Sequence, residues 1–207
     1  MIRFLKKGDK VINVGTQSGI EALRFAQIIG DTGKLYLFES NPASFNLINK
    51  SVYLNGLENF TTVYHVAAGD SYYQTAERVH RDNTGGGRVI QTRRFVEGEM
   101  DKDGFVKVGV TVMPLDDILR EVSGVNFIML DTEGLEKDIL IGMKRLIERS
   151  PGVVIWSEWS NQSRGVVSDG RVGTLDNIKA LADWFEAKGY ALYMAVSENP
   201  GTEPQAC

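Results

Sequence analysis

Short apolar runs alternate with segments of helical periodicity along most of this 207-residue chain. In such a pattern each apolar run is a candidate buried strand and each periodic segment a candidate helix. The predicted strands are residues 10–14, 34–39, 61–66, 125–130 and 152–158. Regular alternation of this kind is typical of an α/β fold with helices on both faces of a mostly parallel sheet. The sequence therefore predicts a doubly wound α/β fold, and its length fits one domain over 1–207.

Flanking residues delimit some of the predicted helices. Asn41 is a suitable N-cap, Pro42 suits the first helical turn, and Gly56 stands where a glycine commonly follows a helix. Further helices are predicted over residues 18–29, 135–149 and 174–188. Each has apolar positions three and four residues apart, so each can bury one face against the sheet.

The segment from Ser71 to about Thr111 breaks this rhythm because it is polar and has no helical period. We interpret it as an insertion with one or two hairpins. Long insertions in compact domains are often lids over a binding site, although a variable surface loop has the same composition. As a lid, the segment would cover a bound substrate together with the loop 160–173. The candidate substrate contacts are His80, Asn83 and Trp159.

Composition excludes several classes of function. The net charge of -4 lacks the basic excess that nucleic-acid binding needs. No apolar run approaches the roughly 20 residues of a membrane span, and the first residues do not resemble a signal peptide, so we expect a cytoplasmic protein. Cys207 is the only cysteine, which leaves no internal disulfide and no cysteine cluster for zinc. With two histidines and no nucleophile elbow, neither a histidine-rich metal site nor hydrolase chemistry is predicted.

The stretch VINVGTQSGIEAL, residues 11–23, has the form of a nucleotide-binding turn between a strand and a helix. A dinucleotide fingerprint would need glycine at positions 15, 17 and 20, but the chain has Gly15, Gln17 and Ile20. Gln17 would place a side chain where a pyrophosphate must approach. The remaining pattern, Gly15 and Gly19, suits a nucleoside ligand that approaches the turn without a pyrophosphate, such as S-adenosylmethionine. An NAD-dependent oxidoreductase is the less favoured alternative.

Glu39 ends the second predicted strand, about 20 residues beyond the glycine turn. At this spacing a carboxylate accepts hydrogen bonds from two ribose hydroxyls in nucleotide-binding α/β folds. The alternative is an ordinary acid at a strand end. Glycine turn and acid together favour a nucleoside cofactor.

Several segments resemble, in order and spacing, the FkbM-type class I methyltransferases. They are VINVGTQSGIEALRFA, LYLFESNPASFNLINKSVYLNGLENFT, AAGD, VTVMPLDDIL and FIMLDTEGLEKDILIGMKRLI. The resemblance implies S-adenosylmethionine-dependent methylation, usually of a hydroxyl on a sugar or secondary metabolite. It also implies a sheet of seven strands, one of them antiparallel. Only residues 197–207 are left for the seventh strand, so a sheet of six is the alternative. The chain departs from the family pattern at Asn13, Thr16, Gln17 and Met129, which keeps open a non-catalytic cofactor-binding module.

The predicted cofactor site lies at the carboxyl ends of the first strands. Its residues are Asn13, Gly15, Thr16, Gln17, Ser18, Gly19, Glu39, Ser40, Ala68 and Asp70. Asp70 would accept a hydrogen bond from the adenine amine, or belong to an ordinary turn.

Methylation of a hydroxyl requires a base, and three acids follow neighbouring strands. They are Asp131, Glu133 and Glu158. Their alternatives are a magnesium site and simple capping of the next helix. The expected partner is a small-molecule acceptor, with no nucleic acid and no membrane.

Overall fold

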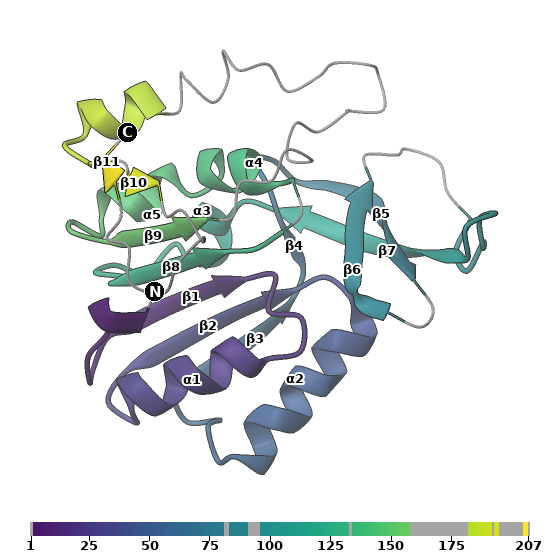
Figure 1. The fold of residues 1–207 in the computed structure, drawn as a ribbon, viewed down its shortest axis with the longest axis horizontal. Coiled ribbons are helices and arrows are strands. Elements are labelled where there is room, and N and C mark those ends of the chain that lie inside the picture. Colours follow the sequence, from purple (N-terminus) through teal and green to yellow (C-terminus); the bar gives the residue numbers. More distant parts are fainter. Residues whose placement is uncertain are drawn as a thin grey trace.

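The computed structural model describes residues 2–80, 83–90, 96–132, 134–157, 182–191, 193–194 and 205–206. A parallel sheet forms its centre (Figure 1). Its strands, in spatial order, are β3 (Thr61–His65), β2 (Lys34–Glu39), β1 (Lys10–Val14), β8 (Phe127–Leu130) and β9 (Val154–Ser157). The strand order reverses between β1 and β8, and ligands of open α/β sheets bind outside the carboxyl ends of the strands at such a point.

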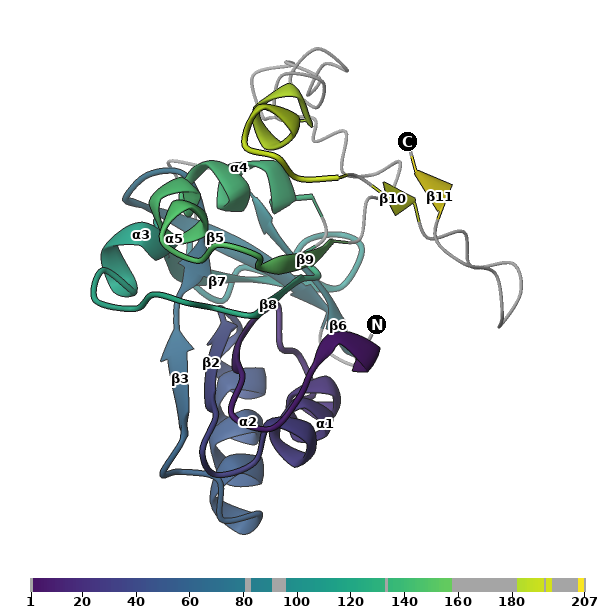
Figure 2. The same ribbon diagram turned by 90° about the vertical axis from the view of Figure 1, so that its left-hand side faces the viewer.

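Helices cover both faces of this sheet, as the sequence predicts (Figure 2). The helices are α1 (Ile20–Ile29) and α2 (Pro42–Leu54) on one face, and α3 (Leu115–Ile118), α4 (Glu136–Ile141) and α5 (Lys144–Glu148) on the other. A short 3-10 helix, Ile2–Phe4, precedes β1. Successive residues of a strand point to opposite faces. Val11 accordingly packs with Phe25 and Phe127 beneath α1, while Ile12 packs with Leu115 and Leu146.

A second sheet occupies the segment predicted to be an insertion. Its strands are β4 (Ala67–Ala68), β5 (Tyr73–His80), β6 (Asn83–Ile90) and β7 (Phe105–Met113), in the order β4-β7-β5-β6. β5 pairs antiparallel with both β6 and β7. The predicted hairpin is therefore confirmed, but much of the segment is regular sheet rather than irregular loop. Figure 1 shows this sheet beyond the carboxyl ends of β1 and β2.

The parallel sheet has five strands among the described residues, fewer than the seven or six expected. In that part of the chain, β10 (Tyr193–Met194) pairs antiparallel with β11 (Gln205–Ala206) rather than with β9. Pairing with each other gives these two short strands main-chain hydrogen-bond partners of their own. The predicted helix over 174–188 is described from residue 182, and residues 182–187 are helical.

Two predicted helix boundaries were wrong. The first helix begins at Ile20 rather than near residue 18, because Gln17 and Gly19 have φ values of 53° and 79°, which an α-helix does not accommodate. The predicted helix 135–149 is divided into α4 and α5 after Gly142. The Gly142 carbonyl accepts a hydrogen bond from Asp116 N at 2.9 Å. The Asp116 carboxylate then caps α5 by accepting from the Arg145 and Leu146 amides.

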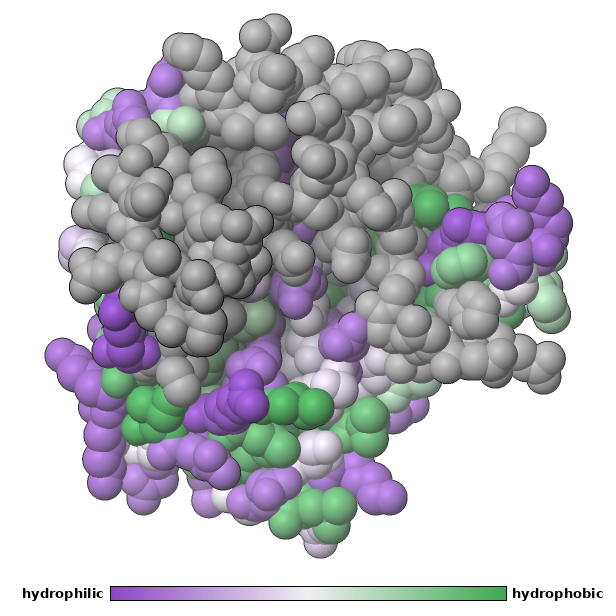
Figure 3. Space-filling model, viewed as in Figure 1, coloured by the Kyte–Doolittle hydropathy of each residue, from purple (hydrophilic) through white to green (hydrophobic). Residues whose placement is uncertain are grey.

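The exposed apolar surface in Figure 3 gathers over α1 and α2. Ile20 of α1 and Leu47 and Leu54 of α2 are exposed there. None of the described helices is both long and apolar enough to span a bilayer.

Candidate functional site

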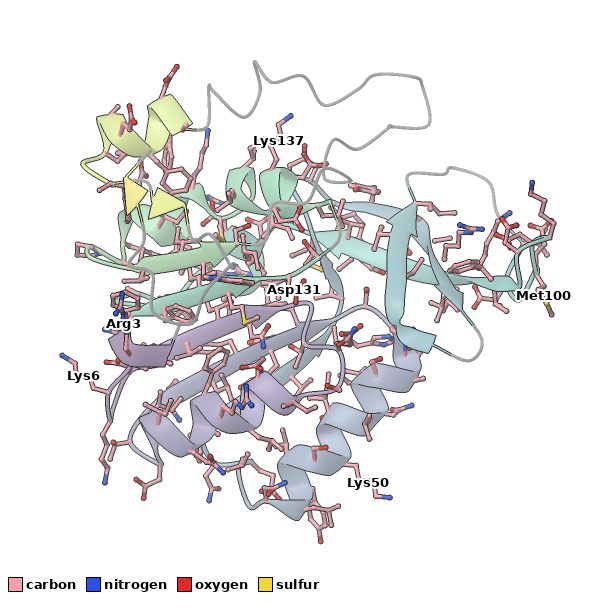
Figure 4. All side chains as sticks on the ribbon, viewed as in Figure 1. Arg3, Lys6, Lys50, Met100, Asp131 and Lys137 are labelled. Atoms are coloured by element: carbon pink, nitrogen blue, oxygen red, sulfur yellow. The ribbon has the colours of Figure 1, made fainter. Side chains whose placement is uncertain are left out.

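The turn after β1 touches the turn after β8. Gly15 has a φ of 81° and donates from its N to the Phe38 carbonyl at 3.0 Å, which ties the turn to β2. A Cβ atom at this position would lie 1.9 Å from the carbonyl oxygen of Asp131. Only glycine fits both the left-handed backbone and this close approach. In Figure 4, Asp131 lies where β8 ends, beside the turn that follows β1.

The remaining turn residues shape the start of α1. Thr16 is buried, and its hydroxyl donates to the Asn13 and Phe38 carbonyls at 3.3 and 3.4 Å. Gly19 closes the turn by donating to the Thr16 carbonyl at 2.9 Å, and as the N-cap of α1 it supplies no side-chain hydrogen bond. Gln17 and Ser18 are exposed. The predicted turn is therefore present, with its two glycines in left-handed conformations.

Glu39 joins two of the elements that form the site. Its side chain is 7% exposed. Oε2 accepts a hydrogen bond from Gln17 N at 2.7 Å, and Oε1 accepts one from Asn41 N at 2.8 Å. Burial raises the pKa of Glu39, while the backbone hydrogen bonds from Asn41 and Gln17 oppose the rise. A carboxylate offers about four lone-pair positions, so these two bonds leave capacity for further donors.

The residues that follow Glu39 begin α2. The Asn41 side chain accepts from Ala43 N at 2.8 Å and from Ser44 N at 3.1 Å, which confirms the predicted cap. Ser40 lies between Glu39 and Asn41. It donates its hydroxyl to Glu77 Oε2 at 2.6 Å, and its carbonyl contacts His65 Nε2 at 3.1 Å. The site therefore receives a side chain from β5 of the second sheet.

Glu77 is a residue of this site that the sequence did not reveal. It is 4% exposed, and burial, chiefly, raises its pKa to about 7. Along the chain it is one acid in a polar segment. The apolar residues Ala76 and Val79, one and two positions away, could have indicated that Glu77 is buried. Its hydrogen-bond partner, Ser40, lies 37 positions away in the sequence and could not have been found in this way.

Asn13 carries a buried polar atom that no described residue satisfies. The residue is 2% exposed at the end of β1, and its Oδ1 has no hydrogen-bond partner. Buried acceptors are nearly always hydrogen-bonded in native proteins. A ligand with an N–H or O–H group near the β1 turn would satisfy it.

The turn after β8 is held by a buried acid that the sequence analysis did not single out. Glu136 is 2% exposed, and its Oε1 accepts from Thr132 N, Thr132 Oγ1 and Gly134 N at 3.1–3.2 Å. This contact fixes the turn that begins with Asp131, which is partly exposed. The other two predicted catalytic acids, Glu133 and Glu158, lie outside the described residues.

Other predicted site residues lie at varying distances from this centre. Ala68 is buried in the core beside α3, and Asp70 accepts a hydrogen bond from Ser71 at 2.8 Å. Asp70 also faces Asp138 of α4, whose pKa is raised by burial and then by Asp70. Of the predicted acceptor contacts, Trp159 lies outside the described residues. The backbones of His80 and Asn83 pair at the β5–β6 turn, and their side chains are not described.

The structure thus brings together a set of predicted residues around the carboxyl ends of β1, β2 and β8. They are Asn13, Gly15, Thr16, Gln17, Glu39, Ser40 and Asp131. Among the described residues, no three His, Cys, Asp or Glu side chains are grouped closely enough to hold a metal ion. The arrangement offers carboxylate and carbonyl acceptors to a ligand that carries hydroxyl and amino groups.

Comparison with known proteins identifies similar chains. The sequence model of the family described as "Methyltransferase FkbM domain" matches residues 13–192. A curated relative, the protein-L-isoaspartate O-methyltransferase of Fervidobacterium nodosum, is 34% identical over 59 residues, which are 28% of this chain and 30% of that protein.

Two solved structures share the fold. Methyltransferase FkbM from Methylobacillus flagellatus KT is similar with a TM-score of 0.57 and 16% identity, over 93% of this chain and 40% of that one. Aeropyrum pernix fibrillarin, solved with natively bound S-adenosyl-L-methionine, is similar with a TM-score of 0.50 and 14% identity, over 92% of this chain and 60% of that one. The chain therefore spans less than half the length of the FkbM structure.

Proposed function

The chain belongs to the FkbM methyltransferase domain family, and from this membership we propose that it transfers the methyl group of S-adenosylmethionine to a hydroxyl oxygen of a small molecule. The observation that carries the proposal is Glu39, a buried acid that ends β2 and is held between the Gly15 turn and the start of α2, one strand away from the point where strand order reverses.

The residues present suit S-adenosylmethionine. Gly15 lets the turn after β1 pack directly against the backbone carbonyl of Asp131, so this turn and the end of β8 form one edge of the site. The Glu39 carboxylate has lone pairs for the ribose hydroxyls. The unsatisfied Asn13 Oδ1 suits a donor such as the cofactor's ammonium group. When bound, S-adenosylmethionine supplies an electrophilic methyl group on a sulfonium.

Asp131 is the candidate base. It directly follows β8 and is in backbone contact with the glycine turn, and Glu136 fixes the turn that it begins. In our proposal, the Asp131 carboxylate accepts the proton of the substrate hydroxyl while the hydroxyl oxygen takes the methyl group. A base is needed because an alcohol is a poor nucleophile until its proton is removed. Glu133 and Glu158 belong to the same proposal as secondary candidates, and magnesium is the alternative use of these acids.

The second sheet supports a site for a small acceptor. It stands beyond the carboxyl ends of the central strands and contacts the site through Glu77 (Figure 1). We assign acceptor contacts to His80 and Asn83 at the β5–β6 turn and to Trp159 after β9. The net charge of -4 favours a small molecule over a nucleic acid.

Calorimetry with S-adenosylmethionine, S-adenosylhomocysteine and NAD tests the cofactor assignment. We expect binding of the first two and no binding of NAD, whereas NAD binding alone would favour an oxidoreductase. A turnover assay then separates an enzyme from a non-catalytic module. Sugars, small alcohols and an isoaspartyl peptide are incubated with labelled cofactor, and mass spectrometry locates the methyl group. Methylation of a carboxylate or nitrogen, and not of a hydroxyl, would contradict the proposed acceptor.

A further inference from the structure

Glu77 connects the second sheet to the turn that carries the ribose-binding acid. It lies in the middle of β5, directly opposite Val89 of β6 and Val108 of β7. Its Oε2 accepts the Ser40 hydroxyl at 2.6 Å, and Ser40 lies between Glu39 and Asn41. Glu39 and Asn41 are themselves joined by a 2.8 Å hydrogen bond. A single carboxylate from β5 therefore holds the residue at the centre of the β2–α2 turn.

Among the described residues, no cationic side chain acts on Glu77. Val89 and Val108, its neighbours across the sheet, carry no charge. From the β2–α2 turn it faces Glu39, which repels it, and receives hydrogen bonds from Ser40 and Asn41. His65 of β3 acts electrostatically on Glu39 and contacts the Ser40 carbonyl. Burial, and then the like charge of Glu39, favour the protonated form of Glu77.

We propose that Glu77 is a positioning residue of the cofactor site, which holds the Ser40–Glu39 turn in its binding geometry and makes cofactor affinity depend on pH near neutrality. This inference rests on the proposed function, because it takes S-adenosylmethionine as the ligand of Glu39. Neither the family match nor the sequence patterns assign Glu77 a role.

The direction of the pH dependence follows from the contacts. An ionised Glu77 accepts the Ser40 hydroxyl as a charge-assisted hydrogen bond, which is roughly twice as strong as a neutral one. Ribose hydroxyls that donate to Glu39 reduce its repulsion of Glu77, and a cationic ligand also favours the ionised form. Cofactor binding should therefore lower the pKa of Glu77 from its value of about 7. By linkage, affinity then rises as the pH rises through this value.

The test measures S-adenosylmethionine affinity by calorimetry between about pH 6 and pH 8. Wild-type affinity should rise about 2- to 5-fold over this interval, corresponding to a pKa change of up to one unit. Glu77→Gln keeps the shape and an acceptor oxygen but does not titrate. Its S-adenosylmethionine affinity should therefore lack the rise with pH that Glu77 gives the wild type. Both proteins meet the same ligand, and their ratio at each pH removes any titration of the cofactor itself.

Glu99→Gln is the matched control. It removes an exposed carboxylate close to β7, whose partner is Lys107, and should retain the wild-type profile. Ser40→Ala removes the hydroxyl that Glu77 holds and should flatten the profile in the same way. The double variant Glu77→Gln/Ser40→Ala should then lose little more affinity than either single variant.

The outcomes separate this inference from the proposed function. If wild type binds no S-adenosylmethionine at any pH, the proposed function fails. If it binds, but Glu77→Gln retains the wild-type pH profile, the inference about Glu77 is overturned. An additive double variant overturns the link through Ser40. Thermal unfolding confirms that each variant is folded, and Ser40→Ala keeps the inference testable if Glu77→Gln is not.

Discussion

A Cβ atom at position 15 would stand 1.9 Å from the backbone carbonyl oxygen of Asp131. The glycine that follows β1 and the acid that follows β8 therefore meet through their backbones, with no room for a side chain between them. This contact joins the proposed cofactor turn to the proposed base at the point where strand order reverses.

Gly15→Ala should destabilise the fold because it adds both backbone strain and a clash with the backbone. The left-handed conformation costs an alanine about 1 to 2 kcal/mol, and the clash should bring the total loss above roughly 3 kcal/mol. Urea unfolding measures the change. Gly56→Ala is the matched control, because Gly56 has a φ of 65° with nothing within 4 Å of the added atom. Equal losses in the two variants would show that the contact with Asp131 contributes nothing.

Glu39→Gln should weaken cofactor binding by about 10- to 100-fold, since a hydrogen bond to a charged group contributes about 1.5 to 3 kcal/mol. The NH2 group of the new amide also faces one of the two backbone N–H groups, of Gln17 or Asn41, that now donate to Glu39. Calorimetry with S-adenosylhomocysteine measures the loss, and Glu58→Gln, at an exposed position, serves as the control. Unchanged affinity in Glu39→Gln would remove the ribose assignment.

Asp131→Asn should lower kcat by about 100-fold or more with little change in cofactor affinity, because it keeps the shape and removes the basicity. Turnover of the acceptor identified above measures the effect. Asp117→Asn, at an exposed acid of α3, should retain wild-type turnover. A loss of cofactor affinity equal to the loss of turnover would make Asp131 a cofactor ligand instead of a base.

Glu77 should make the folded protein less stable as the pH rises. Its pKa is about 7 in the folded state against the ordinary glutamate value of 4.5, so between these values the folded state binds more protons than the unfolded state. The free energy of unfolding then decreases with increasing pH, by up to about 3 kcal/mol from this group. Denaturant unfolding at about pH 5 and pH 8 should show the decrease in wild type and a smaller one in Glu77→Gln. Parallel curves for the two proteins would contradict the raised pKa.

The local parts of the site were predictable from sequence. Gly15 and Gly19 form the predicted turn after β1, and Asn41 caps α2 as expected. Such features depend on neighbouring residues, whose preferences are readable along the chain. Glu39 was predictable for a similar reason, because a strand end at a known spacing places an acid at the sheet edge.

The Glu77–Ser40 contact was not predictable, because it depends on how β5 pairs with β6 and β7. A shift of one residue in this register would turn Glu77 to the opposite face. Nor could periodicity show that the helix 135–149 is divided. That break depends on Asp116, which lies outside the segment and caps α5.

The sequence by itself determined the α/β class, the glycine turn and the acid at the end of β2. Each of these follows from apolar periodicity or from the backbone preference of a few adjacent residues. Only the tertiary structure decided that the polar segment after β4 forms a sheet and that this sheet delivers Glu77 to Ser40. Contacts between residues far apart in sequence depend on strand register and packing, which no local pattern encodes.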